Sequence, residues 1–512
     1  MLNISKVSSL CALFVVILCE AETSRVIDLS GEWKFISRNK SISGTGQVPG
    51  DIYTDLFNNN VIDEPLYGDN HRFANWVARD DWTYTKQFEF DPKLLEKSSA
   101  FLFINGLDTV ASVFLNDKLV ANSANQFVCQ YSDITKALKN DNTIRIKFVS
   151  PVKYAYRKAK AYEKVSGHEV PPICPVDVQH GECYHNFIRK AEYSFSWDWA
   201  PNFPTVGISH PIQIAVFESV YLKDFSWTTR LEKGIWTVNL EIMLLHTNKN
   251  GEVKWTVNIE ELNTKQKFVR KIREGSQMMI HKMKLQVPDN KIQRWWPNKY
   301  GKQRLYNIKV SMPNGNEMTK KIGFKTVKLV QDFVNPKNAS IGRNFYFKIN
   351  EIPIFLKGSN WVPISMFPYD TNQTDRMRFL LDSTAEAVGV YESEEFYDYA
   401  AEKGILIWQD LMFSCTLYPM DDEFIENIKT EVRQQIWRLR KHTSILTFNA
   451  NNENELAIRK HWYKADNYTE KQQVSDYVAL YVNVISPIVK KLLDSSHPFL
   501  LSSPSNGIET VM

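Results

Sequence analysis

The sequence predicts a multidomain chain of β plus α/β class, with two β-sandwiches followed by a domain that alternates strands and helices. The length of 512 residues is more than one ordinary domain buries around a single core. Short alternating apolar runs between turn residues fill the chain up to about residue 330. After about residue 340 the hydrophobic period changes from that of strands to a mixture of strands and helices.

The first β domain is expected at residues 22–220. Thr109 to Leu115 alternates and is followed by Asn116-Asp117 and then by Lys118 to Val120, which is a hairpin signal. Similar runs occur at residues 82–90, 143–150 and 212–217. Because few helical segments separate these runs, the pattern favours a jelly-roll-like β-sandwich.

The second β domain is expected at residues 221–328. Its strands are predicted at Ile235 to Leu245, Glu252 to Ile259 and Leu305 to Val310. The segment has a length suited to one immunoglobulin-like β-sandwich.

The third domain is expected at residues 329–512. Strands are predicted at residues 354–357, 405–408 and 445–448, and helices at residues 375–387, 422–442 and 477–493. The helix at 422–442 has one apolar stripe, made by Phe424, Ile428, Val432, Ile436 and Leu439. Strands that alternate with helices are typical of a (β/α)8 TIM barrel, whose functional residues lie at the carboxyl ends of its strands.

The N-terminus has the pattern of a secretory signal peptide. Lys6 precedes an apolar run from Leu10 to Leu18, and residues 19–21 form a plausible cleavage region. The alternative is a membrane anchor, but this run is shorter than the roughly 20 residues that a spanning helix needs. We therefore expect a signal peptide at residues 1–21 and no membrane span. Lys and Arg number 62 against 58 Asp and Glu, without a long block of one sign, which argues against a nucleic-acid partner.

The cysteines indicate an oxidising compartment rather than a metal site. Cys174 and Cys183 flank a short loop that Pro171, Pro172 and Pro175 stiffen, which favours a local disulfide. The alternative is a pair of buried free thiols. Neither a zinc spacing nor a Cys-x-x-Cys motif occurs, so no metal is expected. Four sequons also fit the secretory pathway, at Asn39, Asn338, Asn372 and Asn467.

Polar residues are concentrated directly after the strand predicted to end at Phe448. The segment from Asn449 to Glu455 lies where a barrel places its active site. A carboxylic acid there could protonate a leaving oxygen, and Asn452 could bind a sugar hydroxyl. The alternative is a solvated loop whose Asn and Glu residues cap the next helix.

A second group of residues suits a sugar ring. Trp197, Asp198 and Trp199 place one carboxylate between two aromatic side chains. Aromatic faces stack on sugar rings and a carboxylate accepts hydroxyl hydrogen bonds, so these residues could form a monosaccharide pocket. The alternative is ordinary sandwich core with Asp198 in a turn.

Several motifs, in order along almost the whole chain, resemble the β-mannosidases of glycoside hydrolase family 2. They are Val48-Pro49-Gly50, Asp80-Asp81-Trp82-Thr83-Tyr84, Phe195-Ser196-Trp197-Asp198-Trp199, Trp295-Trp296-Pro297, Phe355-Leu356-Lys357-Gly358-Ser359-Asn360-Trp361, Trp408-Gln409-Asp410 and Asn451-Asn452-Glu453-Asn454-Glu455. The Trp-Trp-Pro motif is similar to the wider family, whereas Trp197-Asp198-Trp199 together with residues 451–455 resembles its mannosidase branch.

The resemblance implies a retaining exo-hydrolase that removes terminal non-reducing β-D-mannose from β-mannoside glycans or oligosaccharides. It implies a lysosomal location, a galactose-binding-like fold for residues 22–220, and no cofactor. By resemblance Glu453 is the general acid/base, rather than Glu455. The implied substrate-binding residues are Trp197, Asp198, Trp199 and Asn452.

The sequence also departs from this family. The Ser-Glu-Phe/Tyr-Gly segment that carries the family's nucleophile is not found before Met512, and the Arg-Val-Trp-Gly-Gly-Gly strand is not found between Ala387 and Val388. Because the second barrel strand is not found, we expect an incomplete barrel. Hydrolysis with retention of the anomeric configuration requires a second carboxylate about 5 Å from the first. Because the segment that carries it is not found, we expect no β-mannosidase turnover by this chain alone. The alternatives are a secreted carbohydrate-binding pseudoenzyme and another family 2 activity, such as β-galactosidase or β-glucuronidase.

Overall fold

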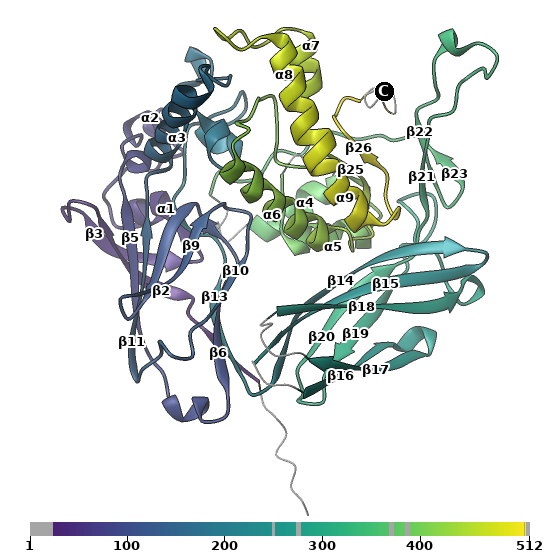
Figure 1. Cartoon of the computed structure of the whole chain (residues 1–512), viewed down its shortest axis with the longest axis horizontal. Helices are drawn as coiled ribbons and strands as arrows, with labels where there is room; N and C mark the ends of the chain where they lie inside the picture. The colour runs from purple at the N-terminus through teal and green to yellow at the C-terminus, as the bar shows by residue number, and fades with distance from the viewer. Residues whose placement is uncertain are drawn as a thin grey trace, which may run out of the picture.

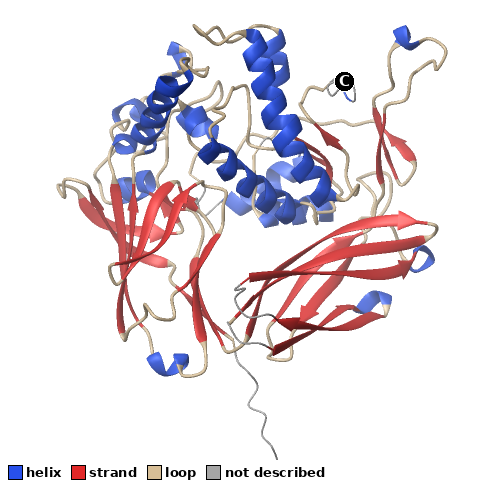
Figure 2. Cartoon of the chain, in the orientation of Figure 1, coloured by secondary structure: helices blue, strands red, loops and turns tan. Residues whose placement is uncertain are grey.

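The computed structural model describes residues 24–247, 251–272, 278–367, 373–383, 390–505 and 507. Most of its strands form two large stacks, and most of its helices gather in one group beside them (Figures 1 and 2). The predicted signal peptide, the sequon at Asn372 and the junction between Ala387 and Val388 all lie outside the described residues.

The first stack is a β-sandwich of a four-stranded and a six-stranded sheet. The four-stranded sheet has the order β1 (Arg25–Asp28), β13 (Ile212–Phe217), β6 (Ser99–Ile104) and β10 (Gln130–Asp133). The six-stranded sheet has the order β3 (Ser43–Val48), β2 (Gly31–Ser37), β5 (Trp82–Glu89), β11 (Asp141–Phe148), β8 (Val110–Leu115) and β9 (Lys118–Ala124). Short strands β4 (Gly50–Asp51), β12 (Gly207–Ile208) and β7 (Leu107–Asp108) and helices α1 (Ile52–Asn58), α2 (Asn70–Phe73) and α3 (Pro151–Ser166) complete this region.

The predicted hairpin in this sandwich forms as expected. β8 and β9 pair antiparallel around Asn116 and Asp117, whose φ angles are 50° and 64°. Asn and Asp tolerate this left-handed conformation, and two such residues in succession suit the twist of a tight hairpin.

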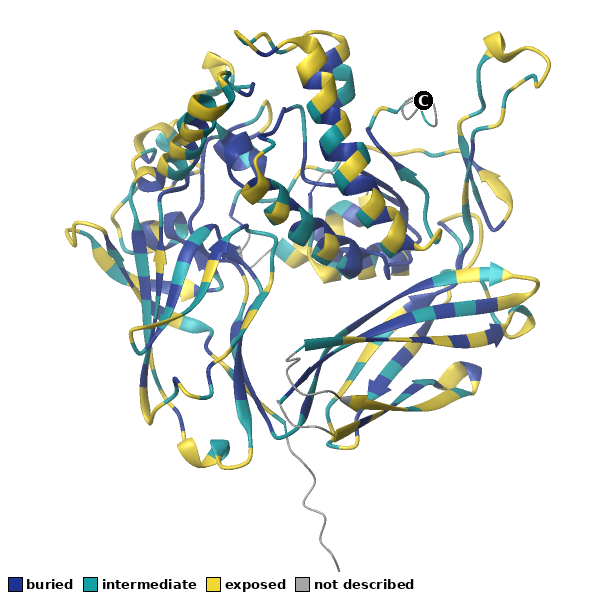
Figure 3. Cartoon of the chain, in the orientation of Figure 1, coloured by how far each residue is buried: buried dark blue, intermediate teal, exposed yellow. Residues whose placement is uncertain are grey.

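The second stack is a sandwich of seven strands. Its three-stranded sheet has the order β14 (Val220–Glu232), β15 (Ile235–His246) and β18 (Met278–Pro288), and its four-stranded sheet has the order β17 (Thr264–Ile272), β16 (Gly251–Ile259), β19 (Leu305–Ser311) and β20 (Glu317–Gly323). Alternate side chains are buried along β16 and β18, as Figure 3 shows, because a sandwich strand turns every second residue toward the core. The two β-rich domains predicted from the sequence are therefore present.

The described residues of the third region form an open parallel sheet and no closed barrel. Its described strands are β24 (Ile407–Asp410), β25 (Ile445–Asn449) and β26 (Phe499–Leu500), in that order. An antiparallel sheet of β21 (Val327–Val330), β22 (Tyr346–Ile349) and β23 (Ile352–Ile354) precedes it. The helices are α4 (Gln373–Ser383), α5 (Glu394–Lys403), α6 (Asp422–Leu439), α7 (Asn454–Arg459), α8 (Glu470–Tyr477) and α9 (Ser486–Leu493).

Two predicted elements of this region need correction. The strand expected at residues 354–357 does not join the parallel sheet, because Asn350 and Glu351 form a tight turn that pairs β23 with β22 instead. The third parallel strand is β26, which the hydrophobic pattern of the sequence did not predict. The single helix expected at residues 477–493 is interrupted by a π-helical stretch, Val478–Ile485, before α9 begins near Pro487. No described helix is long and apolar enough to cross a membrane.

A long excursion from the first sandwich, residues 151–206, packs on the third region. Ala155 and Ala159 of α3 and Phe195 belong to the same apolar cluster as Ile436 of α6 and Phe448 of β25. Burying apolar surface in one shared core fixes the excursion against the ends of the parallel strands. This excursion contains Trp197, Asp198 and Trp199.

Candidate active site

The loop after β25 is held against the loops that follow the two neighbouring strands, β24 and β26. Asn452 forms parallel bridges with Ser414, in the loop after β24, and with Ser503, in the loop after β26. The Asn452 side chain accepts a hydrogen bond from Ser414 Oγ at 2.9 Å and donates to the Ser503 carbonyl at 3.0 Å. These neighbours orient the amide from both sides, and they use one of its two N–H hydrogens.

Glu453 is placed by an unusual backbone conformation. Its φ of 61° lies in the left-handed region, and its backbone N–H donates to the Ser503 carbonyl at 2.9 Å. The side chain is half-buried, and its Oε2 lies 3.1 Å from Cys415 Sγ. The side chain of Asn451 accepts the N–H of Asn454 at 3.2 Å, so the capping role considered for this loop is filled by Asn451 and not by Glu453.

Trp197, Asp198 and Trp199 form a tight turn closed by a bridge between Trp197 and Ala200. Asp198 is exposed, and Trp199 is 41% exposed while its ring lies 5.3 Å from that of Tyr193. Asp198 is thus not a core residue, and its carboxylate faces solvent.

Contacts through the excursion connect this turn with the loop that carries Glu453. The Trp197 ring meets the His185 ring edge-on at 6.1 Å, and His185 Nε2 lies 2.9 Å from Thr416 Oγ1. The Thr416 backbone N–H then donates to the Asn454 side chain at 3.0 Å. Burial lowers the pKa of His185 to about 4, so this connection is made by a neutral imidazole.

Glu192 makes a second connection between the same two segments. Its Oε2 accepts the Ser414 backbone N–H at 3.0 Å, and its Oε1 accepts a short hydrogen bond from the Tyr418 hydroxyl. Burial raises the pKa of Glu192 to about 7, although the nearby Arg189 guanidinium opposes this rise. The two predicted constellations therefore lie on segments that share this framework.

The sequence pattern did not predict His185, Glu192 and Cys415 as site residues. Each contacts a residue more than 35 positions away along the chain, as in the contact between Cys415 and Glu453 at a separation of 38. No local pattern encodes such contacts. The local signals are weak: polar residues lie just before the Trp197 motif, and the run Ser414-Cys415-Thr416 begins four positions after Asp410.

The predicted disulfide between Cys174 and Cys183 is formed, and it supports the Trp197 turn. The loop that it closes contacts the segment before that turn, because the Ser196 hydroxyl donates to the Gln179 carbonyl at 3.0 Å. The Glu182 N–H likewise donates to the Phe195 carbonyl at 3.0 Å. The sequons at Asn39, Asn338 and Asn467 are all exposed.

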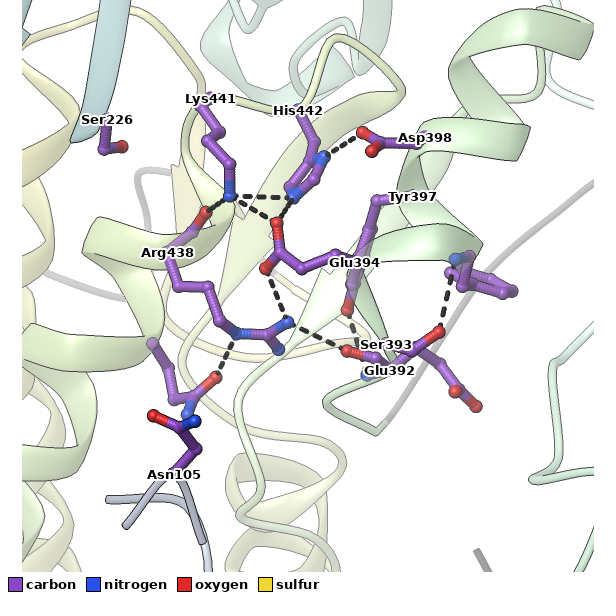
Figure 4. A network of polar contacts seen from close by, with 12 residues as sticks. Asn105, Ser226, Glu392, Ser393, Glu394, Tyr397, Asp398, Arg438, Lys441 and His442 are labelled. Atoms are coloured by element: carbon purple, nitrogen blue, oxygen red, sulfur yellow. Dashed lines mark hydrogen bonds and ion pairs between the residues drawn. The ribbon is translucent and has the colours of Figure 1, made fainter. Parts of the chain in front are cut away.

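A second polar cluster lies away from this site. Figure 4 shows Glu394 bound by Arg438, Lys441 and His442, with Arg438 at 3.1 Å and Lys441 at 2.6 Å. Desolvation opposes ionisation of Glu394, but His442, Lys441 and Arg438 hold the pKa of its carboxyl well below its ordinary value. The cluster borders a cavity of about 1190 Å³ between the three regions, and the described residues that line it include neither Glu453 nor Asp198. This arrangement joins α5 to α6, and no grouping of described residues resembles a metal site.

Comparison with known proteins identifies the class of protein. Residues 33–210 match the domain described as glycosyl hydrolase 2 galactose-binding domain-like, and residues 220–325 match the domain described as glycosyl hydrolases family 2. These are the two sandwiches described above. The chain therefore belongs to glycoside hydrolase family 2.

Within that family the chain is homologous to β-mannosidases. A probable β-mannosidase of Caenorhabditis elegans is 48% identical over 499 residues, which cover 95% of this chain and 55% of that protein. The β-mannosidase of Capra hircus is 39% identical over 505 residues, covering 94% and 56%. A crystal structure of β-D-mannosidase from Dictyoglomus thermophilum matches with a TM-score of 0.81 and 27% identity, covering 94% and 58%. The chain thus spans a little over half the length of these relatives.

Proposed function

We propose that this chain supplies the sugar-binding and acid/base portion of an exo-acting, retaining β-mannosidase. The observation that carries the proposal is the shared framework of His185 and Glu192, which holds the Trp197 turn and the Glu453 loop together. In the proposed complex, Asp198 accepts hydroxyl hydrogen bonds from a terminal β-D-mannose residue. The flanking tryptophans cover the sugar's apolar face, and Asn452 contacts another hydroxyl.

In the proposed reaction Glu453 protonates the glycosidic oxygen as a carboxylate attacks the anomeric carbon, and then activates the water that releases mannose. Glu192 is the other carboxylate whose charge raises the pKa of Cys415, the thiol in contact with Glu453. It is only 5% exposed, and both of its oxygens are hydrogen-bonded, so it is not free to attack a sugar. We assign no nucleophile among the described residues and expect no unaided turnover by this chain.

The proposed setting is lysosomal glycan breakdown after entry into the secretory pathway. The proposal rests on the resemblance to lysosomal β-mannosidases, the signal-like N-terminus, the disulfide and the exposed sequons. We propose Asn39, Asn338 and Asn467 as glycosylation sites, together with Asn372, and an incomplete TIM barrel for residues 329–512.

Rescue by an external nucleophile tests the acid directly. We expect azide to accelerate phenol release from phenyl β-D-mannoside: azide bonds to the anomeric carbon, the bond to the phenolic oxygen breaks, and Glu453 protonates that oxygen. Because phenol is a poor leaving group, Glu453→Gln should reduce the azide-dependent rate by about 100-fold or more. The product expected is α-mannosyl azide, measured with phenol by chromatography.

Glu455→Gln is the matched control, because it removes a carboxyl two residues away in the first turn of α7. It should retain the azide-dependent rate. Equal loss in both variants would contradict the assignment of Glu453. No azide-dependent release by the unmodified chain would favour the carbohydrate-binding pseudoenzyme. Faster release from phenyl β-galactoside or β-glucuronide would favour another family 2 activity.

A further inference from the structure

The Glu453 carboxylate has a thiol as its neighbour. Cys415 Sγ lies 3.1 Å from Glu453 Oε2, which is within reach of a hydrogen bond from a thiol to a carboxylate. Cys415 is one of two free cysteines among the described residues and is only partly exposed. A thiol in this position donates its proton to the carboxylate and so fixes where that carboxylate points.

The backbone of Cys415 is held by hydrogen bonds at both its N–H and its carbonyl. Its N–H donates to the Asn452 carbonyl at 2.9 Å, and its own carbonyl accepts a short hydrogen bond from the Tyr463 hydroxyl. Its φ of 46° is in the left-handed region, which a residue with a side chain adopts only where its surroundings impose it. The neighbouring Ser414 is anchored by Glu192 of the excursion, as described above.

We infer that Cys415 is a positioning residue for the acid/base Glu453, a role that rests on the proposed function of that glutamate. The thiol holds Oε2, which leaves Oε1 as the oxygen that carries the proton toward the glycosidic bond. Glu192 and Tyr463 hold the cysteine in turn, so the excursion of the first sandwich orients the acid through Ser414 and Cys415.

The contact itself is tested by thiol alkylation, without any need for hydrolysis. Burial raises the pKa of Cys415 to about 12, and the hydrogen bond to Glu453 adds to this rise. Glu453→Gln removes the negative charge, so iodoacetamide should alkylate Cys415 about three- to tenfold faster at pH 8. The rate is followed by mass spectrometry of the Cys415 peptide, and exposed Cys129 in the same sample should react at an unchanged rate.

The positioning role is tested by conservative replacement. Cys415→Ser keeps a donor and should retain the azide-dependent release of phenol within about threefold, whereas Cys415→Ala should lose about tenfold, the effect of one lost hydrogen bond to a charged group. A merely space-filling role would give the opposite ranking or no difference.

The two arms separate failure of this inference from failure of the proposed function. If no form of the chain releases phenol, the proposed function fails, while alkylation still decides whether the thiol binds Glu453. An unchanged Cys415 alkylation rate in Glu453→Gln, with Cys129 also unchanged, overturns the inference. Azide-dependent phenol release by Cys415→Ala as fast as by the unmodified chain also overturns the inference.

Discussion

Glu453 and Cys415 both have left-handed backbone conformations without being glycine, with φ angles of 61° and 46°. Each such residue costs on the order of 1 kcal/mol and persists where its surroundings impose it. The hydrogen bonds to the Ser503 and Asn452 carbonyls hold the two residues in place. At the scale of single residues, both members of the contact between the acid and the thiol carry this backbone strain.

Glu192 should make stability depend on pH. Its pKa is raised to about 7 in the folded chain, so between about pH 4.5 and pH 7 the unfolded chain releases a proton that the folded chain retains. Rising pH therefore destabilises the fold through this group. Glu192→Gln removes the penalty and should be more stable than the unmodified chain by about 2–3 kcal/mol at pH 7.5.

The comparison is made by thermal unfolding of both proteins across this range. At pH 4.5 the glutamate is protonated in the folded chain and about half protonated in the unfolded chain, so the two proteins should differ much less than at pH 7.5, and this measurement serves as the control. A difference that does not grow between pH 4.5 and pH 7.5 would show that Glu192 is not held in this buried environment.

The sequence predicts single residues well where the determining contacts are local. The disulfide of Cys174 with Cys183 spans nine positions in a proline-rich loop, and it was predicted. The contact of Glu192 with Ser414 spans 222 positions, and no local sequence pattern predicts it. The exposure of Asp198 and the capping role of Asn451 likewise depended on the folded surroundings.

Among the elements, the excursion and α6 are tied together by a buried ion pair. The Arg189 guanidinium binds both oxygens of Glu431, at 2.7 Å and 2.8 Å, and also donates to the Met412 carbonyl at 2.7 Å. Both side chains are fully buried. The pair fixes the excursion over the loop between β24 and α6.

Removal of one partner should be more harmful than removal of both. Arg189→Met leaves the Glu431 charge buried without its cation and should lower the free energy of unfolding by about 3–5 kcal/mol, measured by urea denaturation. Arg189→Met combined with Glu431→Leu should recover part of this loss. If Arg189→Met unfolds at the same urea concentration as the unmodified chain, the ion pair does not stabilise the fold as proposed.

Element prediction succeeded where a periodic pattern was long and failed where a local turn or a short strand decided the outcome. The stripe of α6 predicted a helix that the structure contains. The Asn350 and Glu351 turn instead removed the expected strand at residues 354–357 from the parallel sheet. β26 is only two residues long, which is too short for alternation to reveal.

At the scale of the whole molecule, each sandwich has its own apolar core, whereas the third region shares its core with the excursion. Motif order along the chain was sufficient to recognise the family. Motif order could not show that the excursion places the Trp197 motif and the Glu453 motif, more than 250 positions apart, on one framework. This placement depends on packing between regions. The proposed sugar site is therefore a product of two regions together.

Binding of methyl β-D-mannoside to the purified whole chain, followed by saturation-transfer NMR and titration calorimetry, tests this proposed site most directly. We expect binding that weakens about tenfold or more in Asp198→Ala, because the carboxylate's hydrogen bonds to the sugar are lost. Methyl β-D-glucoside, which differs at one hydroxyl, should bind more weakly than the mannoside. Equal affinity of Asp198→Ala and the unmodified chain for the mannoside would contradict a mannose site at the Trp197 turn.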